Sequence, residues 1–143
     1  MKAFVYHAKF EAGDEQGIVV TFPDVPEAVT QGDDLADARA QAEEALGLAL
    51  LTYPQRGLPL PACKSRGRGL KPIAVAPEIA AKLAVLDAFR SAKLTKKELG
   101  RRLGKDEKEV RRILDPRHRT KLPALRTTLN ALGRRLVVGV EAV

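Results

Sequence analysis

Residues 95–114 read TKKELGRRLGKDEKEVRRIL and contain two helix starts separated by a glycine. Thr95 and Glu98 have the spacing of a capping box, in which a hydroxyl accepts a hydrogen bond from the third helical amide and the carboxylate reaches back to the capping residue. Asp106 and Glu109 repeat that spacing. Gly104 lies between the two boxes, and glycine is common just past a helix end because it adopts the left-handed conformation. The stretch therefore predicts two short helices joined by a tight turn, a helix-turn-helix.

The second of these helices separates apolar from charged side chains. Val110, Ile113 and Leu114 fall on the side expected to face a core. The outer side carries the residues that would meet a DNA major groove: Glu107, Lys108, Arg111 and Arg112. A basic tract, residues 117–121, follows and suits phosphate oxygens. A solvent-facing helix without a ligand shows the same i,i+4 charge pairs, so this alternative stays open.

The cations of this region are the candidate DNA-binding residues. They are Lys96, Lys105, Lys108, Arg111, Arg112, Arg117, Arg119 and Lys121. The charge of the whole chain supports the choice, because its 143 residues hold 25 Lys and Arg against 18 Asp and Glu. Residues 1–62 hold four bases and ten acids, a net charge of −6, whereas residues 63–143 hold 21 bases and eight acids, a net charge of +13. We therefore expect the two halves to bind different partners.

The first 62 residues predict a small α+β domain. Apolar side chains alternate from Ala3 to Phe10 and again from Ile18 to Phe22, as in half-buried strands, and a third short strand is expected near Ala28–Thr30. Asp34 is expected to cap a helix that ends near Leu51. The predicted domain, residues 1–62, is thus a sheet of two or three strands with one covering helix.

The rest of the chain is expected to be a linker and a helical domain. Residues 53–77 contain five of the nine prolines, and we place the linker at residues 63–76, with at most a brief strand at Ile73–Val75. The second domain, residues 77–143, is predicted to begin with a helix at Pro77 and to end, after a helix stopped by Gly133, in an apolar strand at Leu136–Val140. That strand needs a partner, either Ile73–Val75 or a second subunit.

The residue types predict no enzyme, no metal and no cofactor. Cys63 is the only cysteine and is expected to be an inert linker thiol; His7, expected at a surface or interface, and His118 are the only histidines. Four carboxylates leave one alternative open, a magnesium-dependent nuclease: Asp14, Asp24, Asp33 and Asp34. Turn and capping roles explain these carboxylates without a metal. Because the chain has neither the ~20-residue apolar run of a membrane span nor a signal-peptide core, we expect a cytoplasmic protein.

Two stretches in each half match a known family pattern. Residues 17–33 read GIVVTFPDVPEAVTQGD and residues 57–61 read GLPLP; this half resembles HicB-type antitoxins. Residues 98–104 and 115–122 read ELGRRLG and DPRHRTKL, and are similar to the C-terminal helix-turn-helix of one branch of that family. Other members end in a ribbon-helix-helix, which the helix signals from Thr95 onward argue against here.

The resemblance implies two binding activities and no catalysis. In the family, the N-terminal domain has a degraded ribonuclease-H-like fold and neutralises a small basic toxin, HicA, which is an mRNA-cleaving ribonuclease. The C-terminal domain dimerises and binds operator DNA, and this represses the toxin–antitoxin operon. A stand-alone repressor with a ligand-sensing N-terminal domain stays open as an alternative, and a toxin reading frame beside the gene would separate the two.

Overall fold

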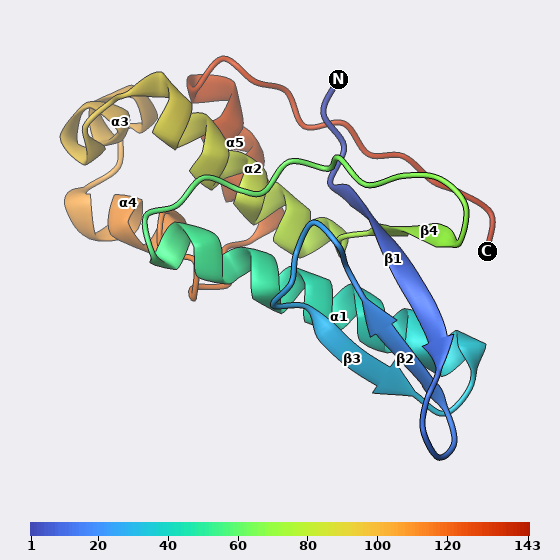
Figure 1. The fold of residues 1–143 in the computed structure, drawn as a ribbon. Coiled ribbons are helices and arrows are strands. Elements are labelled where there is room, and N and C mark those ends of the chain that lie inside the picture. Colours follow the sequence, from blue (N-terminus) through green and yellow to red (C-terminus); the bar gives the residue numbers. More distant parts are fainter. The chain divides into compact units, whose positions relative to one another are not determined.

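The computed structural model describes the whole chain, residues 1–143, as two compact units that divide between Ala76 and Pro77. The fold class is α+β, with one four-stranded antiparallel sheet and five helices (Figure 1). The first unit holds the sheet and one helix, and the second holds the other four helices. None of the helices combines the length and the low charge that crossing a membrane requires.

The sheet of the first unit has the strand order β3-β2-β1-β4. Its strands are β1 (Val5–Ala12), β2 (Ile18–Thr21), β3 (Val29–Gly32) and β4 (Leu70–Ala74). Every neighbouring pair is antiparallel. Tyr6 and Ala8 of β1 are buried with Val20 of β2 and Ile73 of β4, as the alternation of apolar residues predicts.

The helix of this unit, α1 (Leu35–Gln55), begins at the predicted cap. The Asp37 amide donates to Asp34 Oδ1 over 2.8 Å, and the Asp37 carboxylate accepts from the Asp33 amide over 2.8 Å. A Cβ on Gly32 would clash with the backbone of Ala38, so glycine allows β3 to end directly against the helix. The buried face of α1 repeats every four residues: Ala38, Ala42, Leu46 and Leu50.

The segment at residues 63–76, expected to be a linker, contributes a strand to the sheet. Leu70–Ala74 forms β4, which pairs with β1 over five residues. Pro72 fits there because an edge strand has one side with no ladder bonds to lose. The first unit therefore keeps four more cations than expected and holds eight bases against ten acids. The second unit holds 17 bases against eight acids and stays strongly basic.

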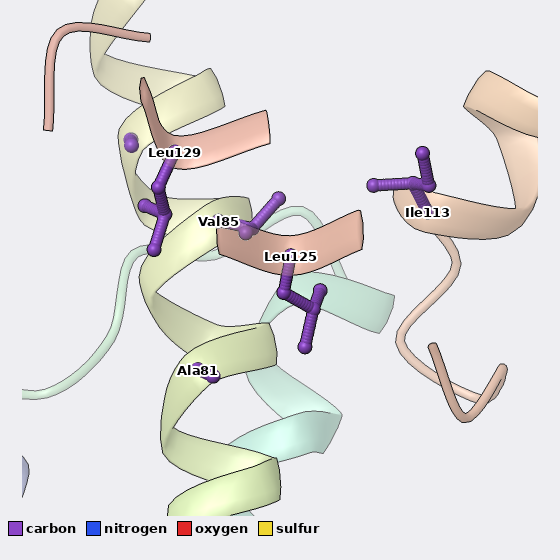
Figure 2. Packing of buried hydrophobic residues seen from close by; sticks show 6 residues of the cluster. Ala81, Val85, Ile113, Leu125 and Leu129 are labelled. Atoms are coloured by element: carbon purple, nitrogen blue, oxygen red, sulfur yellow. The ribbon is translucent and has the colours of Figure 1, made fainter. Parts of the chain in front are cut away.

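The second unit is built from four helices around one apolar cluster. They are α2 (Pro77–Ala92), α3 (Lys96–Leu103), α4 (Glu107–Ile113) and α5 (Leu122–Ala131). Figure 2 shows the cluster, in which Ala81 and Val85 of α2 meet Ile113 of α4 and Leu125 and Leu129 of α5. All five are buried, so three helices share one core.

The terminal strand predicted at Leu136–Val140 is wrong for the single chain. Residues 134–143 form neither helix nor strand. Leu136 packs partly against the helical core, whereas Val137, Val138 and Val140 are exposed. Strand structure depends on a partner edge. The Ile73 region, one of the two partners expected for this strand, is paired with β1 instead.

Candidate nucleic-acid interface

The turn between α3 and α4 has the two predicted helix caps. Thr95 Oγ1 accepts from the Glu98 amide over 3.1 Å, and Asp106 Oδ1 accepts from the Glu109 amide over 2.9 Å. Gly104 has φ 64° and ψ 33°, the left-handed conformation that its position predicts. The Glu98 carboxylate pairs with Arg101 at 3.6 Å rather than reaching back to Thr95, so the cap is formed by the hydroxyl alone.

The crossing of α3 and α4 depends on a second glycine. A Cβ on Gly100 would lie 3.0 Å from the Lys105 carbonyl oxygen and 3.2 Å from Val110 Cγ2, which is tighter than ordinary contact. Leu99 and Val110 are fully buried on the inner faces of the two helices. The close crossing and the buried contacts thus fix the orientation of α3 and α4 relative to each other, and with it the position of the outer face of α4.

The outer face of α4 holds two cations without acidic partners. Arg111 Nη2 lies 2.8 Å from Glu107 Oε1 in an i,i+4 ion pair. Lys108 and Arg112 are exposed and take part in no ion pair. They are also four residues apart, and like charges at this spacing destabilise a helix. An anion bound between them would remove that repulsion.

The other candidate cations divide in the same way. Lys105 Nζ lies 3.7 Å from Glu109 Oε2, and Arg117 Nε lies 3.4 Å from Asp115 Oδ1. The Arg117 amide also donates to Asp115 Oδ1 over 2.9 Å, and this bond is the main cause that lowers the pKa of Asp115. Three candidates are exposed and have no acidic partner: Lys96, Arg119 and Lys121. Five of the eight predicted residues therefore have no acidic partner in the chain and can bind an anionic ligand without first breaking an ion pair.

A buried lysine that was not among the predicted site residues joins the basic tract to α4. Lys82 of α2 is only 4% exposed, and its Nζ donates to the Ile113 carbonyl and the Thr120 hydroxyl, each over 2.7 Å. A longer bond of 3.3 Å reaches the carbonyl of Arg112. Burial lowers the pKa of the Lys82 ammonium to about 8, while nearby Asp115 acts in the opposite direction.

Lys82 therefore acts at the carboxyl end of α4, where carbonyls lack helical partners and the helix dipole is negative. Through Thr120 it also fixes the tract at residues 117–121 close to that helix end. One sequence signal could have revealed it, namely a lone lysine between the apolar residues Ala81 and Leu83.

Two of the four carboxylates considered as magnesium ligands have other partners. Asp34 caps α1, and Asp24 accepts three hydrogen bonds from Lys64 and Ser65. No group of three or more His, Cys, Asp or Glu side chains in the chain is arranged to hold a metal ion. The structure does bring His7 Nδ1 to 3.7 Å from Cys63 Sγ, a contact between residues far apart in the sequence.

Comparison with known proteins gives matches over almost the whole chain. "Antitoxin HicB 1" of Photorhabdus laumondii subsp. laumondii is 36% identical over 143 residues, which cover 99% of this chain and 90% of that protein. "Antitoxin HicB" of Escherichia coli K12 is 35% identical over 133 residues, which cover 92% of this chain and 95% of that protein. No protein-family model matches the chain.

Proposed function

The chain belongs to the HicB antitoxin family, and from this premise we propose that it neutralises a HicA-type ribonuclease and represses its own operon by binding operator DNA. The first unit, with a degraded ribonuclease-H-like fold, binds the toxin. The second unit dimerises and binds DNA through a helix-turn-helix made of α3 and α4. Antitoxin relatives that match over both units support an antitoxin role for the whole chain.

The observation that carries the DNA half is the pair of unpartnered cations, Lys108 and Arg112, on the outer face of α4. In the proposed complex α4 enters the major groove, where Lys108, Arg111 and Arg112 reach base edges. The remaining candidates contact phosphates and set the orientation of the protein on the duplex: Lys96, Lys105, Arg117, Arg119 and Lys121. The net charge of the second unit, with 17 bases against eight acids, favours the approach to DNA.

The toxin half is supported by the charge and exposure of α1. Residues 33–44, around the first half of the helix, hold five acids against one base, Arg39. Leu35 and Leu48 are exposed on the same helix. Acidic side chains together with an exposed leucine, Leu35, at the start of the helix suit a small basic partner, which a ribonuclease that binds mRNA is expected to be.

Two measurements test the proposal with the full chain. We expect a mobility shift of the DNA upstream of its own gene at lower protein concentration than random duplex of equal length, and co-purification with the product of a neighbouring small reading frame. Lys108→Ala with Arg112→Ala should abolish the preference for the upstream DNA and leave the co-purification intact. Equal binding of both duplexes by the unchanged protein would refute the DNA half, and failure to retain the toxin would refute the toxin half.

A further inference from the structure

A second basic surface lies in the first unit, away from α3 and α4 in the sequence. It is the end of the connection that leads into β4 together with the first two residues of that strand, residues 63–71, called here the basic loop; Figure 1 shows it at the end of the long green connection between α1 and β4. Four of its nine residues are cations: Lys64, Arg66, Arg68 and Lys71. All four side chains are exposed, and none takes part in an ion pair.

The basic loop is fixed at both ends. At its start, the Asp24 carboxylate accepts from the amides of Lys64 and Ser65 and from the Ser65 hydroxyl, each over 2.8 Å. These bonds, that from the Ser65 amide foremost, lower the pKa of Asp24, so the anchor stays charged. At its end, the chain enters β4, where Leu70 pairs with Lys9 of β1. The cations are therefore held in a defined part of the surface rather than on a free tether.

The charge of the basic loop is compensated locally only in part: Lys64 is attracted by Asp24, and Lys71 Nζ lies 5.3 Å from the centroid of the Phe10 ring, whereas Arg66 and Arg68 have no such partner. Residues 45–76 contain no acid at all. Asp24, the acid that touches the loop, already has three donors, all of them loop groups that are neutral. Gly67 and Gly69 have φ 114° and 80° and nothing within 4 Å of a Cβ built on either, so Arg66 and Arg68 flank open space. Exposed like charges repel, and a polyanion is the ligand that removes this cost.

The chemistry favours a phosphate backbone over the other partners of the protein. Guanidinium groups bind phosphate oxygens in a bidentate manner, and the basic loop presents two of them two residues apart. A basic toxin has the wrong sign for this surface. We propose that the basic loop forms a second contact with duplex DNA, in which Arg66 and Arg68 bind phosphates while α4 reads the operator. This inference rests on the proposed operator binding and assigns part of it to the first unit.

The test measures how the operator affinity of the full chain depends on salt. Each phosphate contact contributes about 0.9 to the slope of log affinity against log salt concentration. Arg66→Ala with Arg68→Ala should therefore lower the magnitude of that slope by about 2 on the DNA upstream of the gene and on random duplex alike. Lys2→Ala with Arg56→Ala removes the same charge from the first unit outside the basic loop and should leave the slope unchanged, as should Arg66→Lys with Arg68→Lys.

An unchanged slope in the double alanine variant, or an equal loss in the Lys2 and Arg56 control, would overturn the inference. Retention of the slope together with loss of toxin co-purification would assign the basic loop to the toxin and overturn it as well. Lys108→Ala with Arg112→Ala distinguishes failure of the proposed function from failure of this inference. If this variant loses its preference for the operator while Arg66→Ala with Arg68→Ala binds DNA as the unchanged protein does, operator binding by α4 holds and only the role of the basic loop fails. An unchanged protein that does not bind its upstream DNA would refute both.

Discussion

Replacement of Lys82 by methionine tests how the second unit holds its basic tract. Methionine keeps an unbranched apolar stem but removes the amine that donates to Ile113, Thr120 and, more weakly, Arg112. Thr120 is half exposed and can turn to water, whereas the Ile113 carbonyl belongs to a buried residue and loses its short bond. A buried acceptor left without a donor costs about 1–3 kcal/mol. We expect the free energy of unfolding at pH 7 to fall by at most that amount, because methionine also removes the cost of burying the Lys82 ammonium.

The same variant has a pH signature that a general packing defect lacks. The pKa of Lys82 is lowered to about 8 in the folded protein, from 10.5 for an unperturbed lysine such as that of the unfolded chain. Between these values the unfolded chain binds more protons, so stability rises with pH. The advantage of the unchanged protein over Lys82→Met should therefore grow from pH 7.5 to pH 10, by at most about 3 kcal/mol. At high pH the neutral amine still has two N–H groups for Ile113 and Thr120.

Urea denaturation at both pH values measures these differences, with Lys97→Met as the control on an exposed lysine of α3. The control should change neither the stability at pH 7 nor its pH dependence. If Lys82→Met were as stable as the unchanged protein at pH 7 and followed it in parallel up to pH 10, the buried lysine would not be the tie between α2, α4 and the basic tract.

Three further predictions concern other contacts. Lys108→Ala and Arg112→Ala should each weaken operator binding by about 1–3 kcal/mol if the side chain reads a base edge. Arg111→Ala should weaken binding less, because Arg111 is already paired with Glu107. Gel shifts in which only Arg111→Ala weakens binding would contradict this ranking. Gly100→Val should lower the free energy of unfolding by about 1–3 kcal/mol, since its Cβ would crowd the Lys105 carbonyl, and an unchanged urea midpoint would argue against the close crossing. Asp24→Ala removes a charged acceptor whose hydrogen bonds contribute about 1.5–3 kcal/mol each. Hydrogen exchange at the Lys64 and Ser65 amides should therefore become at least about tenfold faster, and an unchanged exchange rate would show that other contacts hold the basic loop.

The features that the sequence predicted well are local ones. The caps at Thr95 and Asp106 and the turn at Gly104 involve residues within a few positions of each other, so their spacing carries the information. The inward side of α4 followed from helical periodicity, since Val110 and Ile113 are buried as expected. Pro77 is another local signal, because proline is common at the first position of a helix, and it is the first residue of α2.

The features that the sequence did not reveal depend on partners far along the chain. β4 lies in a segment whose prolines and glycines resemble a linker, and only pairing with β1 makes it a strand. The apolar segment at Leu136–Val140 is the converse case, because its pattern is that of a strand but no strand of the single chain pairs with it. Among the candidate site residues, the sequence identified the cations but not which of them are paired with acids, and Lys82 was missed because its acceptors lie some thirty residues away.

The boundary between the two units, which lies between Ala76 and Pro77, also changes the net charge of each unit and therefore the partner that its charge suggests. With β4 in the sheet, the first unit carries ten acids and eight bases, and its acidity is concentrated at α1 rather than spread over the unit. The partner of each surface is therefore better predicted from single elements than from the net charge of a half. Acidic α1 suits the toxin, whereas α4 and the basic loop suit phosphate.

The central claim, that this chain is an antitoxin which silences a ribonuclease, is tested most directly by mRNA cleavage in vitro. The purified toxin encoded beside the gene is incubated with an mRNA substrate while the full chain is added in increasing amounts. Our account predicts that cleavage stops near one chain per toxin, and that Lys108→Ala with Arg112→Ala inhibits equally well because the DNA surface is not used. Cleavage that continues unchanged at a large excess of the chain would contradict it.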